Sequence, residues 1–305
     1  MEVIDMNIPS DSFVKLGCDS LEGVSNKFLR RRSSEYLRAD YLREGDLNLS
    51  IDPEKENKLI RLCQIDDETT TLGIDTSNIV LGNTEEGILC AVRGTVVWKE
   101  KATYQYLRYG PFIFHITERN KYALYNTLRR AYLDVDDGVG VPILERTVER
   151  IRSILERWLQ SQLCEATCNS LILWDGSLTT RTVNNTISGL SEILHTARKN
   201  HNCILAFSKK TTLSVGGRRF NDLIDGRFAP CLLDIDKDVQ MQYSGHLHFL
   251  GRIYVAKFSS TSFAFRLDID RRVSEDEGLN AVGKLLGNEL LACLLYTSPS
   301  PRDRS

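Results

Sequence analysis

Two aspartates each follow a short apolar run and precede small turn residues. Asp175 ends the run in LILWDGSL and precedes Gly-Ser, and Asp75 lies in TLGIDTSNIVL, where Thr-Ser-Asn follows it. Apolar runs of this length predict buried strands, here with a carboxylate at the end of a sheet. Neighbouring strands would bring these two acids together although about a hundred residues separate them. Because close carboxylates repel unless a cation lies between them, the pair predicts a divalent-metal site.

A third acid is expected beside the two aspartates. A divalent metal that hydrolyses a phosphodiester holds the phosphate, activates water and stabilises the leaving oxygen. The long helix expected before Asp175 offers Glu156 on the margin of its apolar face, with Glu149 two turns earlier as the reserve. The alternative is that both glutamates are solvated side chains of the helix surface.

The chain changes character near residue 70. Residues 1–70 are predicted to be an N-terminal helical arm and an acidic linker, and residues 71–292 one domain. The domain should begin with an antiparallel meander that carries Asp75 on its first strand. Helices and strands then alternate, and a helix between the Asp175 strand and CILAFSKK implies that these two strands are parallel. Together these patterns predict an α/β fold with a mixed sheet flanked by helices. The later elements are expected as helices over 122–133, 142–165, 185–199 and 278–291 and a hairpin over 252–270.

Composition fits an ordinary globular protein. The 305 residues are 42% hydrophobic with a net charge of −2, which does not by itself indicate a nucleic-acid binder. No apolar stretch approaches the roughly 20 residues that span a bilayer, and the N-terminus does not resemble a secretory signal. We therefore expect a cytoplasmic protein. The eight cysteines are scattered, without zinc-finger spacing, and are expected to be small buried side chains.

The sequence lacks the motifs that identify several classes of enzyme. No glycine-rich loop ends in Gly-Lys-Ser/Thr, no dinucleotide fingerprint follows a strand, and no Gly-x-Ser-x-Gly elbow occurs. These absences count against nucleotide-driven motors, dinucleotide oxidoreductases and serine hydrolases.

A family resemblance covers about residues 70 to 290. GIDTSN, the glutamate-bearing helix, LILWDGSL, ILAFSKKTTL and YVAKFSSTSFAFRLDI occur in the order seen in the NurA family of archaeal and bacterial nucleases. The resemblance implies a ribonuclease H-like fold and a Mn²⁺- or Mg²⁺-dependent nuclease that degrades DNA as a 5′-to-3′ exonuclease and as an endonuclease. It also implies a homodimer that partners a hexameric HerA-type ATPase in DNA end resection for recombinational repair.

Residue by residue, the resemblance assigns the metal to Asp75, Glu156 and Asp175. Lys209, in the Ser-Lys turn, would face the substrate phosphate, and as an ordinary surface lysine it would have no role. The first motif departs from the family's Asp-Gly-Ser, because Thr76 follows Asp75. Residues 293–305 resemble translated adapter sequence, so we expect them to be non-native and the family's C-terminal segment to be cut off.

Two other functions stay open. One is a non-catalytic DNA-binding adaptor of the same motor, and the other is a phosphoryl-transfer enzyme of the sugar-kinase and actin kind. Asp75-Thr76-Ser77-Asn78 does not provide the glycine-rich loop that such kinases need. His246 and His248 alternate in a predicted strand and are candidate metal ligands, although polar residues on an exposed sheet face are common. Tyr104, Tyr106 and Tyr109 could stack on single-stranded bases, although half-buried tyrosines are also common in strands.

Overall fold

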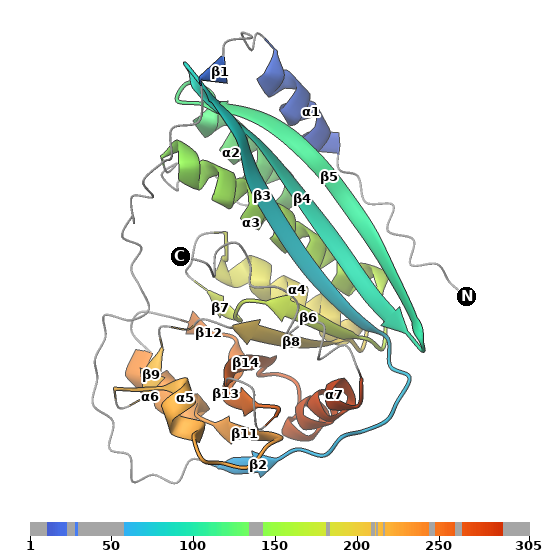
Figure 1. Cartoon of the computed structure of the whole chain (residues 1–305). Coiled ribbons are helices and arrows are strands. Elements are labelled where there is room, and N and C mark those ends of the chain that lie inside the picture. The colour runs from blue at the N-terminus through green and yellow to red at the C-terminus, as the bar shows by residue number, and fades with distance from the viewer. Residues whose placement is uncertain are drawn as a thin grey trace.

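The fold was determined as a computed structural model (Figure 1). It describes residues 11–22, 28–29, 58–133, 143–180, 184–208, 211, 213–215, 217–243, 248–259 and 264–288. The helices are α1 (Asp11–Leu21), α2 (Lys121–Leu133), α3 (Leu144–Ala166), α4 (Ile187–Lys199), α5 (Phe220–Ile224), α6 (Asp236–Tyr243) and α7 (Glu275–Gly287). None of the helices in the described part of the chain is both long and apolar enough to cross a membrane.

One large mixed sheet organises the molecule. Its strands, in spatial order, are β2 (Leu59–Arg61), β11 (Cys231–Asp234), β13 (Gly251–Lys257), β14 (Phe265–Asp270), β8 (Cys203–Ser208), β6 (Leu171–Asp175), β3 (Thr71–Thr84), β4 (Gly87–Glu100) and β5 (Thr103–Thr117), with β1 (Phe28–Leu29) on β3. Two small ribbons lie outside it: β7 (Thr179–Thr180) with β12 (His248–Phe249), and β9 (Ser214–Val215) with β10 (Arg218–Arg219).

Strand directions confirm the predicted fold class. β3, β4 and β5 form the expected antiparallel meander, and β6 and β8 run parallel to β3 on its other side. Three antiparallel strands followed by two strands parallel to the first make up a ribonuclease H-like sheet. The predicted hairpin is also present, as β13 and β14. The expected α/β architecture, a mixed sheet flanked by helices, is therefore correct.

Helix α3 covers one face of the meander. Its apolar positions, among them Val148, Ile151 and Leu155, recur at helical spacing and are buried against β3 and β4. Close approach depends on Gly94 of β4, because a Cβ built there would lie 2.4 Å from Cδ1 of Leu159. In Figure 1, α2 and α3 lie behind the meander.

Adding a single methyl group at this helix–sheet contact should destabilise the protein. For Gly94→Ala we expect a loss of about 1–3 kcal/mol in the free energy of unfolding, since Leu159 must move within a filled core. Urea unfolding would measure it, with an unchanged slope against denaturant. Ala substitution at Gly226, where no atom lies within 4 Å, introduces no clash and tests positive-φ strain alone.

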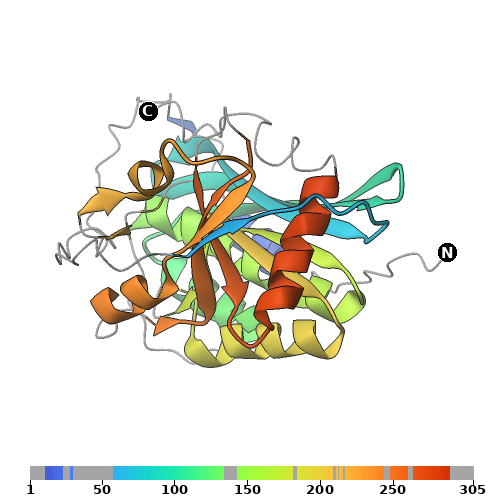
Figure 2. The ribbon, with the colours of Figure 1, turned by 90° about the horizontal axis from the view of Figure 1, so that it is seen from below.

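The opposite face is covered farther along the sheet. Ala281, Val282 and Leu285 of α7 pack there against β6, β8 and β14, whereas α4 packs on the α3 side (Figure 2). Residues 58–70, expected as a linker, add β2 to the sheet edge, and Ile65 donates its backbone N–H to Gly283. In the expected arm, Phe13 of α1 is fully buried in the main core. Residues 1–10, 23–27 and 30–57 of that arm and linker, and the 293–305 tail, lie outside the described residues.

Candidate active site

The two predicted aspartates lie at the same level on neighbouring parallel strands. β3 and β6 pair from Thr71 with Leu171 to Gly73 with Leu173, a constant offset of 100 residues. The ladder stops there, two residues before Asp75 and Asp175. Alternation along β3 puts Asp75 on the face opposite α3, whereas Asp175, the last residue of β6, lines a pocket beside α3; both aspartates are exposed. The two carboxylates therefore flank the point where these strands separate.

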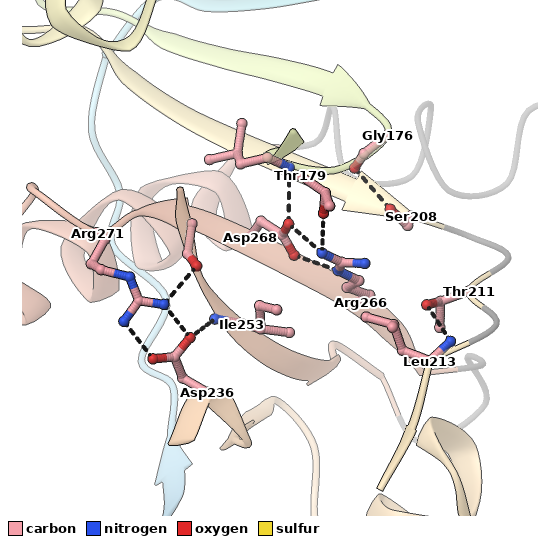
Figure 3. Close-up of polar contacts among 12 residues, drawn as sticks. Gly176, Thr179, Ser208, Thr211, Leu213, Asp236, Ile253, Arg266, Asp268 and Arg271 are labelled. Carbon is pink, nitrogen blue, oxygen red and sulfur yellow. Dashed lines mark hydrogen bonds and ion pairs between the residues drawn. The ribbon is translucent and has the colours of Figure 1, made fainter. Parts of the chain in front are cut away.

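The turn after Asp175 is fixed by the neighbouring strand. Gly176 has a φ of +135°, a conformation that strongly favours glycine. The backbone conformation therefore explains the glycine of the Asp-Gly-Ser motif. Its N–H donates to Phe207 O at 2.7 Å, and Ser208 Oγ donates to Gly176 O at 2.8 Å (Figure 3). The serine of the predicted Ser-Lys turn thus holds the backbone beside Asp175.

A buried ion pair on β14 supports the same turn from the other side. Arg266 donates to both carboxylate oxygens of Asp268 at 2.7 and 2.9 Å, and each side chain is only 1% exposed. Asp268 also accepts the backbone N–H of Leu178 at 2.9 Å, and Arg266 donates to Thr179 Oγ1 at 2.8 Å (Figure 3). These bonds link the residues after the Asp-Gly-Ser turn to the interior of the sheet.

A pocket of about 230 Å³ opens between α3 and the end of β6. Glu156 of α3 and Asp175 of β6 both line it. The other lining residues are Ser153, Arg157, Gln160, Trp174, Gly176, Ser177 and Asn185. The predicted helix glutamate and strand aspartate therefore face a common space. Glu149, the reserve choice, is exposed and does not line the pocket.

The carboxyl of Glu156 has a shifted pKa in this pocket. Burial raises the pKa of its carboxyl, Arg152 and Arg157 oppose that shift, and the nearby charge of Asp175 adds to it. Arg152 forms a 2.9 Å ion pair with Glu156 and donates to Thr76 Oγ1 of β3 at 2.6 Å. Arg152 thus bridges the helix glutamate to the residue next to Asp75.

Several polar atoms around the pocket lack hydrogen bonds. Within the described part of the chain, Arg157 Nη1, Gln160 Oε1 and Trp174 Nε1 are buried without one. Burial also lowers the pKa of Arg157 to about 10, although Arg157 Nη2 donates to Asn185 Oδ1 at 2.6 Å. Unmade buried bonds are costly, so these donors and the acceptor are suited to a polar ligand or water.

The predicted metal ligands are only partly assembled. Among the described residues no three His, Cys, Asp or Glu side chains form a cluster that could hold a metal. Glu156 and Asp175 are nevertheless hard oxygen donors in one open pocket, and Mg²⁺-type ions bind through one or two carboxylates together with water and phosphate. The donor set fits such an ion, with Asp75 as a further ligand in the prediction. Lys209 and His246 lie outside the described residues, and His248 is exposed on β12.

Sequence reasoning missed the arginines of the site. Arg152 and Arg157 follow a helical pattern in which charged residues are typical of a solvated face, yet both are largely buried. Arg266 and Asp268 alternate in a strand and share one face, which was a usable signal for an ion pair. The tyrosines divide: Tyr109 is 8% exposed and packs on Trp158, whereas Tyr104 and Tyr106 are exposed.

The raised pKa of Glu156 predicts a pH dependence in metal-free protein. A carboxyl whose pKa is higher in the folded state loses stability when it ionises, so its unfavourable contribution grows as pH rises from the unfolded pKa through the folded one. Glu156→Gln resembles the protonated form and lacks this loss. Wild type should therefore lose stability relative to Glu156→Gln as pH rises above the ordinary pKa of a glutamate, about 4. Urea unfolding with chelator would measure it; a relative gain would mean that Arg152 outweighs burial.

Comparisons with known proteins give distant likenesses only. No family model matches the chain, and no curated protein matches its sequence. Endonuclease V of Bacillus subtilis aligns with 14% identity over 78% of this chain and 84% of its own, with a TM-score of 0.34. The NurA nuclease of Sulfolobus solfataricus aligns with 13% identity over 75% of each chain and a TM-score of 0.33. A second NurA structure gives 9% identity over 80% of this chain and 88% of its own, with a TM-score of 0.36. With TM-scores below 0.5, these likenesses carry no weight for function.

Proposed function

We propose that the protein is a metal-dependent nuclease that hydrolyses phosphodiesters in DNA. The observation that carries this proposal is the pocket shared by Glu156 and Asp175, in which a half-buried glutamate with a raised pKa faces a second carboxylate. Perturbed acids that converge in a cleft are typical of functional sites. The fork between β3 and β6, where Asp75 lies level with Asp175, supplies the third acid of the proposal.

Each residue of the site then has its own role. Asp175 and Glu156, with Asp75, would hold Mn²⁺ or Mg²⁺, which supplies charge stabilisation and a more acidic bound water. Arg157 lines the pocket, has a buried Nη1 without a hydrogen bond, and would hold a phosphate oxygen. Lys209 would steady the scissile phosphate, as the family resemblance implies. Ser208 and the Arg266–Asp268 pair keep the backbone around Asp175 in place.

The more specific biological role rests on the family resemblance of the sequence rather than on the pocket. DNA end resection with a HerA-type hexameric ATPase, 5′-to-3′ exonuclease and endonuclease action, and a homodimer all come from the order of sequence motifs that resemble NurA. We propose them together, because a dimer with a two-fold axis can present a central channel to a ring-shaped motor.

One observation favours a second candidate, a non-catalytic DNA-binding adaptor. Arg152 already neutralises Glu156 in an ion pair, so a cation is not required at that carboxylate. In this second proposal the fold and the basic side chains of the pocket are kept for binding, and the acids only balance Arg152 and Arg157.

Incubation with end-labelled DNA separates the two candidates. The nuclease proposal expects Mn²⁺- or Mg²⁺-dependent fragments from linear single- or double-stranded DNA, abolished by chelator. Product polarity, read from 5′- and 3′-labelled strands, tests the exonuclease assignment. DNA binding without metal-dependent product under any of these conditions would favour the adaptor.

A further inference from the structure

The outer face of the meander carries a groove of basic and aromatic side chains. It has a volume of about 310 Å³ and lies on the side of β4 and β5 that faces away from α3. Arg93, Thr95, Val97, Tyr104, Gln105, Tyr106 and Arg108 line it. Among the described elements, no helix crosses in front of these strands in Figure 1. We call this surface the meander groove.

The groove exposes rings that a folded protein normally covers. Tyr106 is 63% exposed, Tyr104 48% and Val97 37%. Arg108 Cζ lies 5.0 Å from the ring centre of Tyr106, and Lys99 Nζ lies 5.6 Å from that of Tyr104. Each cation thus lies against a ring that still presents surface to solvent.

The positive charges of the groove, and of Lys99 beside Tyr104, have no ion-pair partner in the part of the chain that the structure describes. Among the described residues no carboxylate forms an ion pair with Arg93, Lys99 or Arg108; Arg93 donates only to Ser77 Oγ, at 3.0 Å. The residues that line the groove include no acid. The charge therefore suits a polyanion, and the rings suit flat groups that stack.

Strand geometry decides between double- and single-stranded partners. Tyr104 and Tyr106 are two residues apart on one strand, so their Cα atoms are separated by about 6.6 Å. Stacked bases of a duplex are only about 3.4 Å apart and turn their edges, not their faces, to a protein. Two rings at twice that spacing fit bases that have separated from one another, as in an extended single strand.

The groove leads towards the proposed active site. The register pairs Asp75 with Thr95, and Thr95 with Arg108, in one row across three strands. Two residues along the strands, Val97 of β4 pairs with Tyr106 of β5, and these side chains face the same side of the sheet as Thr95 and Arg108. A strand that follows the outer face from the tyrosines would therefore reach Asp75, at the fork between β3 and β6.

We propose that the meander groove binds single-stranded nucleic acid, with bases stacked on Tyr104 and Tyr106 and phosphates held by Arg93, Lys99 and Arg108. The assignment deepens the proposed nuclease function by naming the form of substrate that is led to Asp75, and its last step rests on that function. Binding itself needs no metal and no hydrolysis.

The test measures binding of a fluorescent oligo(dT) to the full chain in chelator, by anisotropy. Tyr106→Ala should raise the Kd roughly 5- to 100-fold, and Tyr104→Ala similarly, since stacked bases contribute strongly. Tyr106→Phe keeps the ring and should bind as wild type does. Arg108→Gln should lower the slope of log K against log salt by about 1. Tyr122→Ala is the matched control, because Tyr122 is 55% exposed on α2, on the covered side of the meander.

Several results would overturn the proposal. One is wild-type affinity in the Tyr104→Ala/Tyr106→Ala variant, provided that its circular dichroism and thermal unfolding match those of wild type. Another is a wild-type protein that does not bind oligo(dT). A third is a double variant whose only change is a loss of self-association in sedimentation, because that result would make the groove a contact with a second copy of the chain. If the groove variants bind oligo(dT) and cleave DNA with metal as wild type does, the groove proposal is wrong and the nuclease proposal is kept. If wild type binds oligo(dT) through the groove but cleaves no DNA, the nuclease proposal is wrong and the groove proposal is kept.

Discussion

Asp175→Asn is expected to abolish metal-dependent DNA cleavage. The substitution keeps the shape of the side chain at the end of β6 but removes the charge that faces Glu156 across the pocket. A bound divalent ion contributes several kcal/mol to phosphoryl chemistry, so kcat/KM should fall at least about 10³-fold. Initial rates on end-labelled DNA at saturating Mn²⁺ would measure it. Oligo(dT) binding in chelator should be unchanged, because the meander groove does not include Asp175.

The glutamates of α3 provide the matched control. Glu156→Gln should lose activity in the same range, whereas Glu149→Gln, on the same helix but exposed and away from the pocket, should stay within about twofold of wild type. Equal losses for the two variants would mean that the helix contributes only its overall charge. Full activity in Asp175→Asn would remove the proposed metal site altogether.

Local sequence patterns were sufficient for most of the scaffold. The apolar run of LILWDGSL predicted β6 and its terminal acid, and the hairpin predicted over 252–270 is present as β13 and β14. The β-α-β rule then required β6 and β8 to be parallel, as they are. These features depend on residues close in the chain, where strand and helix periodicity is visible.

The environment of each side chain could not be predicted in the same way. Arg152 and Arg157 have the sequence context of surface residues, and their burial depends on how α3 lies over β3 and β6. Tyr106 and Tyr109 belong to one strand, yet only Tyr109 faces α3 and its Trp158. Which face of a strand is covered is decided by packing between distant segments, which a single sequence does not display.

Asp268→Ala should destabilise the protein more than Gly94→Ala does. Removing the carboxylate takes away the charge that neutralises the buried Arg266 guanidinium, and it leaves the Leu178 N–H without its acceptor. Breaking a buried ion pair from one side costs about 3–5 kcal/mol. For a domain of this size the melting temperature should fall by about 10 °C. Thermal unfolding followed by circular dichroism would measure it, with the exposed Asp19→Ala expected within about 0.5 kcal/mol of wild type.

A double replacement tests the physical reason for that loss. Arg266→Met with Asp268→Leu removes both buried charges together, so it should recover much of the stability lost in Asp268→Ala. Recovery should be incomplete, because Leu178 still lacks an acceptor, at a cost of about 1–3 kcal/mol. A double variant no more stable than Asp268→Ala would show that the hydrogen bond to the turn, rather than the buried charge of Arg266, dominates. In that case cleavage below the melting temperature should fall in both variants alike, because the backbone beside Asp175 would be loosened in each.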